Sequence, residues 1–235
     1  MLFRSKNLIF RQLFDYETWT YTYLLADAVS RDAVLIDTVR EQADRDLSLL
    51  RELGLKLKYV LETHVHADHI TGAAALRAAS GAKVGLSETA GVACADLKLK
   101  DGEELLFGPF RIKAFATPGH TDSCMSYYSE GMLFTGDTLF VRDVGRTDFQ
   151  QGSVQKMFES IRSRIFSLPD ETLVYPGHDY RGHMVTTIGE EKALNPKVGM
   201  SFSFEHFKME MAAMKLGPPK RLHIAVPANL QCGSV

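Results

Sequence analysis

The sequence predicts a mixed fold of strands and helices in which several strands end in loops that carry metal-type ligands. Three observations lead to this prediction. The chain opens with alternating aromatic and polar residues, apolar residues recur later at helical spacing, and His64–His69 holds three histidines and one aspartate. With 235 residues and 45% hydrophobic content, the chain can form a sizeable core. We expect a single domain over residues 1–235 with a short C-terminal helical extension.

The charge pattern argues against a polyanionic partner. The net charge is −2 and both signs are interspersed, so no basic surface is expected to bind nucleic acid or a membrane, and a small-molecule partner is favoured. No apolar run reaches membrane-spanning length, and no apolar segment follows the basic N-terminal residues. We therefore expect a cytoplasmic protein, with the mitochondrial matrix as the alternative if a transit peptide has been removed.

The three cysteines give a hypothesis about redox environment. Cys94, Cys124 and Cys232 are widely spaced and odd in number, which is typical neither of a disulfide framework nor of a structural zinc site. A reducing compartment is the simplest interpretation. We expect Cys124 to be a small buried residue, and Cys232 to be an exposed, oxidisable thiol.

The first third of the chain predicts three strands and one helix. Residues 8–27 alternate and indicate two antiparallel strands with a turn near Asp15, and residues 33–37 form a further apolar strand. An amphipathic helix then extends over residues 43–53 and ends at Gly54. We expect its charged face to be solvated; that face comprises Arg45, Asp46, Arg51 and Glu52.

The histidine-rich stretch is predicted to lie in a loop. Residues 57–61 form a strand that leads directly into it, and the alanine-rich residues 73–79 indicate a helix that follows. Burying three imidazoles and a carboxylate without partners costs several kcal/mol, whereas a metal ion would satisfy them. The stretch therefore predicts a metal site.

Three later strands repeat this arrangement, because each runs into a glycine-containing loop that ends in a possible ligand. Residues 110–117 lead to His120, residues 132–135 to Asp137, and residues 172–175 to His178. Rigid strands that each present one ligand are well suited to hold a metal in fixed geometry.

Helices are expected between and after these loops. Residues 153–166 carry one apolar stripe with Ser153 as the cap, and Thr187 with Glu190 resembles a capping box. The last helix is predicted over residues 204–214, followed by a break at residues 217–219 and a short apolar tail.

Together these residues resemble the ligand motif of the metallo-β-lactamase superfamily. The motif comprises His64, His66, Asp68, His69, His120, Asp137 and His178. The resemblance implies an α+β fold, a four-layered αββα sandwich with the metal site at one edge of two facing sheets.

The resemblance leaves two metal chemistries open. In a binuclear zinc hydrolase of the glyoxalase II type, Asp137 would bridge two metals and a hydroxide would attack a thioester. One metal would be held by His64, His66 and His120, and the other by Asp68, His69 and His178. These hydrolases usually carry a longer helical region at the C-terminus, and here only about forty residues follow Pro196, which disfavours this reading.

The second chemistry uses one iron. Residues 145–152, 175–180 and 226–233 resemble the persulfide dioxygenase family. This resemblance implies one Fe²⁺ per chain, with His64, His120 and Asp137 as the metal-binding and catalytic residues. The other four motif residues would orient these three ligands by hydrogen bonds; they are His66, Asp68, His69 and His178.

The family resemblance also implies the reaction. Glutathione persulfide and O₂ would be converted to sulfite and glutathione, with both oxygen atoms transferred to the terminal sulfur, and the chain would form a homodimer. A tripeptide substrate carries carboxylates, for which Arg146, Tyr180 and Arg181 are candidate partners. The alternative for Arg146 is a structural ion pair with Asp148.

Overall fold

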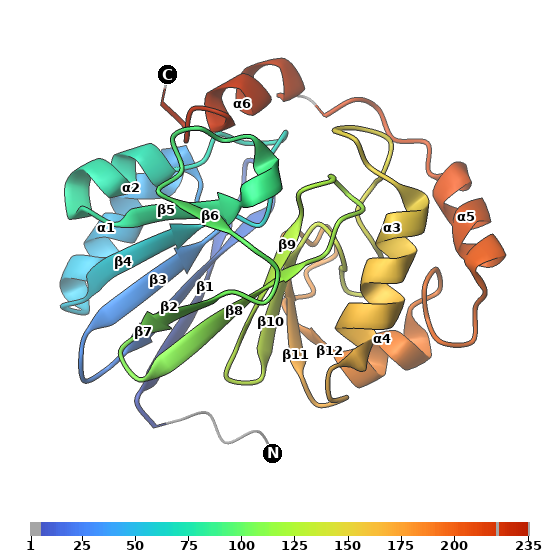
Figure 1. Ribbon diagram of the computed structural model, residues 1–235, viewed down its shortest axis with the longest axis horizontal. Helices are drawn as coiled ribbons and strands as arrows, with labels where there is room; N and C mark the ends of the chain where they lie inside the picture. Colours follow the sequence, from blue (N-terminus) through green and yellow to red (C-terminus); the bar gives the residue numbers. More distant parts are fainter. Residues whose placement is uncertain (1–5, 220, 235) are drawn as a thin grey trace.

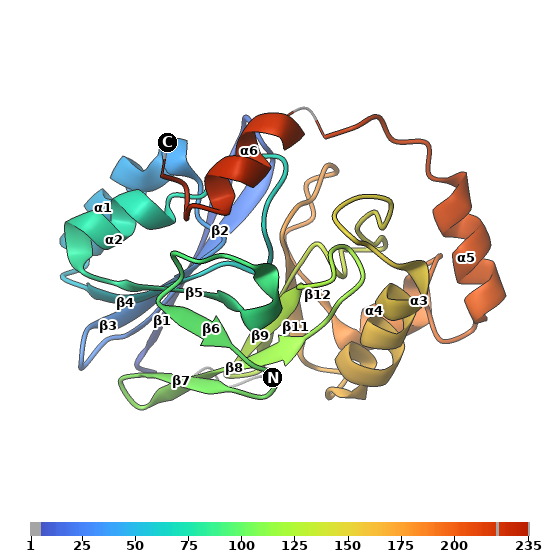
Figure 2. The same cartoon turned by 45° about the horizontal axis from the view of Figure 1, so that its top comes forward.

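Two six-stranded sheets face each other and carry helices on their outer surfaces (Figures 1 and 2). This is the four-layered α+β sandwich that the sequence predicted. The computed structural model describes residues 6–219 and 221–234. The basic N-terminal residues considered in the sequence analysis lie partly within residues 1–5, which are outside the described residues.

The first sheet is antiparallel through its first three strands and parallel from the third to the sixth. The outer face of this sheet is covered by two helices, as Figure 1 shows. In spatial order the strands are β1 (Leu8–Asp15), β2 (Thr20–Asp27), β3 (Asp32–Ile36), β4 (Lys56–Leu61), β5 (Lys83–Ser87) and β6 (Leu97–Leu99), and the helices are α1 (Ala43–Glu52) and α2 (Ala73–Ser80).

The second sheet is antiparallel except where its β10 and β11 strands run parallel. Its spatial order is β12 (Thr186–Thr187), β11 (Leu173–Pro176), β10 (Met132–Gly136), β9 (Met125–Ser129), β8 (Phe110–Ala116) and β7 (Glu104–Phe107). The helices α3 (Val154–Glu159), α4 (Ile188–Leu194) and α5 (Phe204–Ala213) lie outside it (Figure 1).

Three apolar layers hold the sandwich together. The layer between the sheets is rich in aromatic side chains, among them Tyr23, Tyr127 and Phe134, each at most 1% exposed. A second layer joins the first sheet to α1 and α2, and a third joins the second sheet to α3, α4 and α5. Burial of aromatic and aliphatic surface is the main driving force for this arrangement.

The helical stretch predicted at residues 153–166 is continuous but changes its winding. After α3, residues Ser160–Arg164 form a π-turn and Ile165–Ser167 a 3₁₀-turn. The predicted caps are confirmed, since the hydroxyls of Ser153 and Thr187 accept hydrogen bonds from the backbone N–H of Lys156 and Glu190.

The helix predicted over residues 204–214 is present as α5, but the prediction that it is the last helix was wrong. A further helix, α6 (Leu222–Asn229), follows and lies across the top of the molecule in Figure 2. Its sequence hides it, because Pro227 stands inside the helix and apolar residues surround it without a polar stripe.

The charged face of α1 is only partly solvated, contrary to expectation. Asp46 is 1% exposed, and one of its oxygens accepts a hydrogen bond from Arg45. Burial raises the pKa of Asp46 to about 6, which Arg45 only partly opposes.

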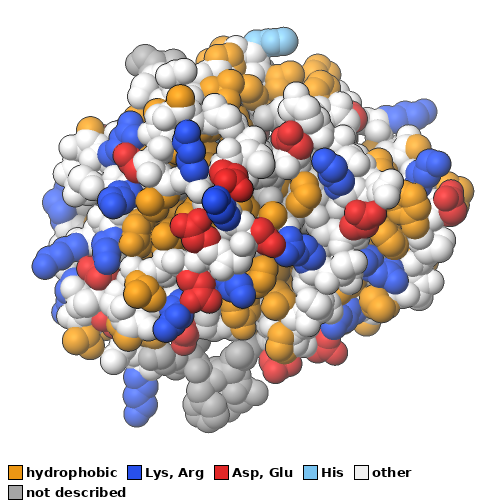
Figure 3. Space-filling view, in the orientation of Figure 1, with side chains coloured by type: hydrophobic (Ala, Val, Ile, Leu, Met, Phe, Trp, Pro, Cys, Tyr) orange, Lys and Arg blue, Asp and Glu red, His pale blue; other side chains and the backbone are white. Residues whose placement is uncertain are grey.

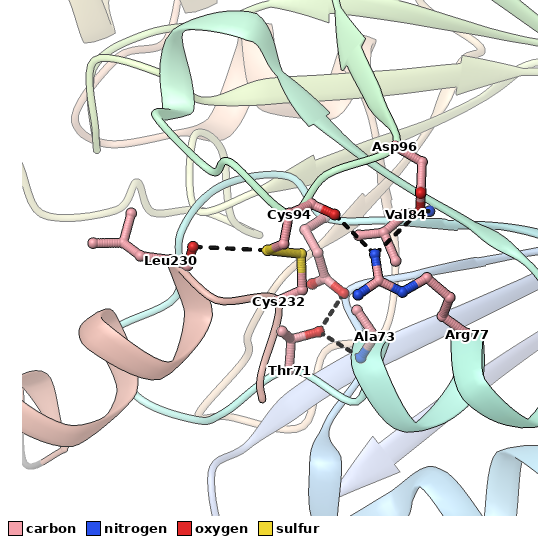
Figure 4. Close-up of a disulfide and its surroundings, with 9 residues drawn as sticks. Thr71, Ala73, Arg77, Val84, Cys94, Asp96, Leu230 and Cys232 are labelled. Atoms are coloured by element: carbon pink, nitrogen blue, oxygen red, sulfur yellow. Dashed lines mark hydrogen bonds and ion pairs between the residues drawn. A yellow bond between two sulfur atoms is a disulfide. The ribbon is translucent and has the colours of Figure 1, made fainter. Parts of the chain in front are cut away.

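The cysteine hypothesis was also wrong. Cys94 and Cys232 form a disulfide that ties the end of α6 to the loop before β6 (Figure 4). Cys232 is therefore a buried half-cystine rather than an exposed thiol, and the argument for a reducing compartment loses its premise. Their separation of 138 residues is why sequence alone does not suggest the pair.

The surface carries mixed charge. On the face drawn in Figure 3, lysine and arginine side chains alternate with aspartate and glutamate side chains. Within residues 6–219 and 221–234, no helix combines the length and apolar character needed to cross a membrane.

Candidate metal centre

Four strand ends bring the predicted ligands to one edge of the sandwich. The loop after β4 carries His64, and the loops after β8, β10 and β11 carry His120, Asp137 and His178. Close approach between β10 and the β4 loop requires glycine, because Gly136 has a φ of +50° and a Cβ there would lie 2.3 Å from Thr63 Oγ1. The two sheets therefore meet at the site where the backbone of Gly136 packs against the side chain of Thr63.

Three side chains converge closely. Ligand atoms of His64, His120 and Asp137 lie within 4.8 Å of one another. His64 Nε2 and Asp137 Oδ1 are buried and have no hydrogen-bond partner in the described part of the chain. Unsatisfied buried polar atoms are costly, and imidazole nitrogen with carboxylate oxygen is a donor set typical of first-row transition metals. The residues present therefore fit a metal ion.

Hydrogen bonding fixes the tautomer of His64. The Thr63 hydroxyl donates to Asp37 Oδ2 at 2.9 Å, because a carboxylate can only accept. Thr63 Oγ1 therefore accepts from His64 Nδ1, 3.0 Å away, which leaves the Nε2 lone pair free. Burial, with smaller effects of His66 and His120, holds the pKa of His64 well below its usual range, so the ring is neutral and able to ligate.

His120 is oriented in the same way from the other sheet. Its Nδ1 donates to the backbone carbonyl of Arg146 at 2.8 Å, and its Nε2 lies 3.7 Å from Asp137 Oδ2. The segment that follows Asp137 is tightly packed, because a Cβ at Gly145 would lie 1.9 Å from the Asp137 carbonyl oxygen. The two ligands from the second sheet are thus held by their own loops.

His66 is directed toward two buried carboxylates. Its Nε2 lies 3.1 Å from Glu62 Oε2 and 3.2 Å from Asp37 Oδ1. Burial alone would lower the pKa of His66, but Asp37 and Glu62 raise it well above the usual range. His66 Nδ1 has no hydrogen-bond partner in the described chain. Hydrogen bonds to the carboxylates thus account for only one of its two ring nitrogens.

The remaining motif residues form a second cluster. Asp68 Oδ2 accepts from His69 Nδ1 at 2.9 Å and lies 3.5 Å from His178 Nε2. Burial opposes the charged form of Asp68, yet His69 and His178 hold its pKa well below the usual value. His178 Nδ1 donates to the Trp19 carbonyl, and His69 Nε2 lacks a partner in the described chain. A second metal position adjacent to the first is therefore chemically feasible.

Four residues that orient the ligands or bind their loop were not predicted from the sequence. Asp37 and Thr63 orient His64, Glu62 accepts hydrogen bonds from Thr38 and Thr71 as well as from His66, and Asn229 binds the ligand loop from α6. The only sequence signal was an acidic residue at the end of two predicted apolar strands, at positions 37 and 62.

The three candidate substrate-binding residues lie around the site and differ in how far their polar groups are already bonded within the chain. Arg146 makes a two-point ion pair with Asp148, at 2.7 and 2.8 Å, and also donates to the carbonyl of Gly217. Tyr180 is 64% exposed and its ring stacks on His178 at 5.9 Å. Arg181 is exposed and donates to the Val141 carbonyl. The structural alternative for Arg146 is thus present.

Two further features bear on chemistry here. Cys124 is buried, and burial raises the pKa of its thiol to about 12, so it is a packed side chain rather than a nucleophile. A cavity of about 220 Å³ opens beside the ligand loops and is lined by residues that include Val65, Thr121, Gln150 and Val226. Val65 and Thr121, which line this cavity, are the chain neighbours of His64 and His120, but the two histidines do not line it.

Known proteins resemble this chain in both sequence and structure. Residues 20–178 match the metallo-β-lactamase superfamily. Two curated relatives are named persulfide dioxygenase ETHE1, mitochondrial: the mouse protein is 46% identical and the human protein 45%, each over 96% of this chain and 89% of the relative. The crystal structure of ETHE1 from Myxococcus xanthus is 51% identical with a TM-score of 0.93, covering 96% of this chain and all of that one.

Proposed function

Because this chain belongs to the persulfide dioxygenase family of the metallo-β-lactamase superfamily, we propose that it oxidises glutathione persulfide with O₂ and water to sulfite and glutathione. Both atoms of O₂ go to the terminal sulfur, and water supplies the third oxygen of sulfite as the S–S bond breaks. The observation that carries the proposal is the close grouping of His64, His120 and Asp137, two histidines and one carboxylate. This donor set leaves open positions on one side of a metal, as non-haem Fe²⁺ oxygenases require.

We propose that His64, His120 and Asp137 hold one Fe²⁺ per chain. Bound Fe²⁺ would supply open coordination positions for the persulfide and dioxygen and would pass electrons from the terminal sulfur to dioxygen. The free Nε2 of His64 supports this assignment, and so does Asp137 Oδ1, which accepts no hydrogen bond in the described chain and lies 3.5 Å from His178 Nε2.

The surrounding residues position the ligands and exclude water. Thr63 and the Arg146 carbonyl hold the Nδ1 protons of His64 and His120 and so keep each Nε2 available. His66, Asp68, His69 and His178 surround the three ligands, and apart from Asp68 they are at most 2% exposed. Of these four, His178 contacts a ligand, with its Nε2 3.5 Å from Asp137 Oδ1. A dry, pre-ordered pocket favours transfer of both oxygen atoms to one sulfur.

The glutathione moiety needs partners for its carboxylates. We propose Tyr180 and Arg181, which lie beside His178, and Arg146, which lies beside His120. Because the Arg146 guanidinium already pairs with Asp148 and donates to the Gly217 carbonyl, it could bind substrate only through the donor hydrogens that these two partners leave free.

A binuclear zinc thioester hydrolase remains the second candidate. The unpaired nitrogens of His66 and His69 favour it, since both would be ligands in a two-metal site. Purification without added metal, followed by measurement of iron and zinc, separates the two. About one iron per chain and no hydrolysis of S-lactoylglutathione is expected; two metals per chain with rapid hydrolysis would overturn the proposal.

Assembly and compartment are separate proposals. We propose a homodimer, which sedimentation of the purified chain tests; a single monomeric species would contradict it. The proposed compartment is the cytoplasm, with the mitochondrial matrix as the alternative that the names of the mammalian relatives favour. Fractionation of the source cells distinguishes the two.

A further inference from the structure

The C-terminal helix reaches the metal-ligand loop through one buried amide. Asn229 is 4% exposed, and its Nδ2 donates to the carbonyl oxygens of His66 and His69 at 2.9 and 2.8 Å. Its Oδ1 accepts from the backbone N–H of Thr71 at 2.9 Å. One side chain thus binds three backbone groups of the loop, on both sides of Asp68.

Apolar packing and a backbone hydrogen bond also hold this C-terminal segment against the loop. Ile70 packs against Ala225 and Ala228 of α6 in a small apolar cluster. The carbonyl of Cys232 accepts from Ala74 N at 3.0 Å, in the first turn of α2. Residues 225–232 therefore lie along the loop and the helix that follows it.

The disulfide is the covalent anchor of this segment. Cys232 lies three residues after Asn229 and is bonded to Cys94 (Figure 4). No helix or strand occupies residues 214–219, which join α5 to α6. The position of Asn229 is held by contacts around the loop and by the disulfide, whereas the segment before α6 is attached at Gly217, whose carbonyl accepts from Arg146.

We propose that Asn229 is a positioning residue of the metal centre. The buried carbonyls of His66 and His69 need donors, and the two amide hydrogens of Asn229 supply them. Without these bonds the loop would relax, and the rings of His64 and His66 would move from their present orientation. The proposal rests on the proposed metal site, but not on the identity of the metal or of the substrate.

The chemistry of an amide explains why asparagine is needed. Aspartate has nearly the same shape, but it would present acceptors to two carbonyl oxygens and could not donate. Alanine would remove all three hydrogen bonds without adding repulsion. The two variants therefore test the same role with different side effects.

The test compares Asn229→Asp and Asn229→Ala with Leu50→Ala, a buried α1 position in the apolar layer between the first sheet and its helices. Leu50→Ala lowers stability without removing a hydrogen bond from the loop. Metal-free protein is titrated with Co²⁺ against a chelator, and amide hydrogen exchange is followed at residues 66–74. We expect both Asn229 variants to bind Co²⁺ about 10–100-fold more weakly and to exchange faster in this segment. Leu50→Ala should keep the wild-type affinity.

Wild-type Co²⁺ affinity in the two Asn229 variants would overturn the proposal, as would equal weakening by Leu50→Ala. Failure of the wild-type chain to bind Co²⁺ would instead refute the proposed metal site. The exchange measurement then still decides whether Asn229 orders the loop, because it needs no metal. If Asn229→Asp does not fold, Asn229→Ala carries the comparison alone.

Discussion

At the scale of single residues, the site is a set of imidazoles whose orientations are held by hydrogen bonds. The chain from His64 through Thr63 to Asp37 shows how one carboxylate determines which ring nitrogen is free. His66 differs, since its Nε2 is bound by Glu62 and Asp37. Because of this difference, we expect substitutions within the same motif to affect metal binding unequally.

Replacing Asp137 by alanine should abolish iron binding, because it removes the only carboxylate of the grouped ligand set. Replacing His66 by glutamine should leave close to one iron per chain. Metal analysis of the two purified variants checks both statements. Loss of iron from His66→Gln, with a normal thermal transition, would contradict the ligand assignment.

Asp46 gives a pH-dependent effect on stability. Its pKa is raised from 3.8 to about 6 by burial, so the folded chain favours the protonated form. The favourable contribution is present below about pH 4 and is lost as the pH rises through about 6. Asp46→Asn should therefore raise the free energy of unfolding at pH 7.5 by up to about 3 kcal/mol and change it little at pH 4. Denaturant titrations at both pH values test this, and an equal gain at both would argue against it.

At the scale of elements, strand ends were predictable and C-terminal contacts were not. Alternation located β1 and β2, short apolar runs located β3 and β4, helical spacing located α1, and alanine content located α2. The strands β6, β7, β9 and β12 were not predicted: β6 and β12 are only three and two residues long, and β9 is polar at Ser126 and Ser129. Helix α6 and its disulfide depend on pairing across the chain, which local patterns do not contain.

The disulfide offers a prediction at this scale. Cys94 is partly exposed, so the thiolate of a small reductant can attack its sulfur. Two molecules of the thiol reductant are oxidised to their own disulfide as the Cys94–Cys232 bond is reduced to two thiols. Cys94→Ser should cost about 2–4 kcal/mol in unfolding free energy. It should also weaken Co²⁺ binding in the wild-type background but not in Asn229→Ala, because both act through the same loop. Fully additive effects on Co²⁺ affinity would show that the bond and Asn229 act separately.

At the scale of the whole molecule, two sheets each contribute ligands, so the metal centre exists only when the sandwich is assembled. The motif residues could be identified from the sequence because they follow four strands in the same way. Asp37, Glu62 and Asn229 could not, since a buried acid or amide looks like a surface residue until its partners are known. The sequence therefore indicated the ligands of the site but not the residues that orient them.

The central claim is oxidation of a persulfide by dioxygen at one iron. The most direct test is the ratio of O₂ consumed to sulfite formed when the iron-loaded protein is given glutathione persulfide, with Asp137→Ala as the matched control. The account predicts one O₂ consumed for each sulfite, and no uptake by the variant. Sulfur release without O₂ consumption, or equal uptake by Asp137→Ala, would contradict it.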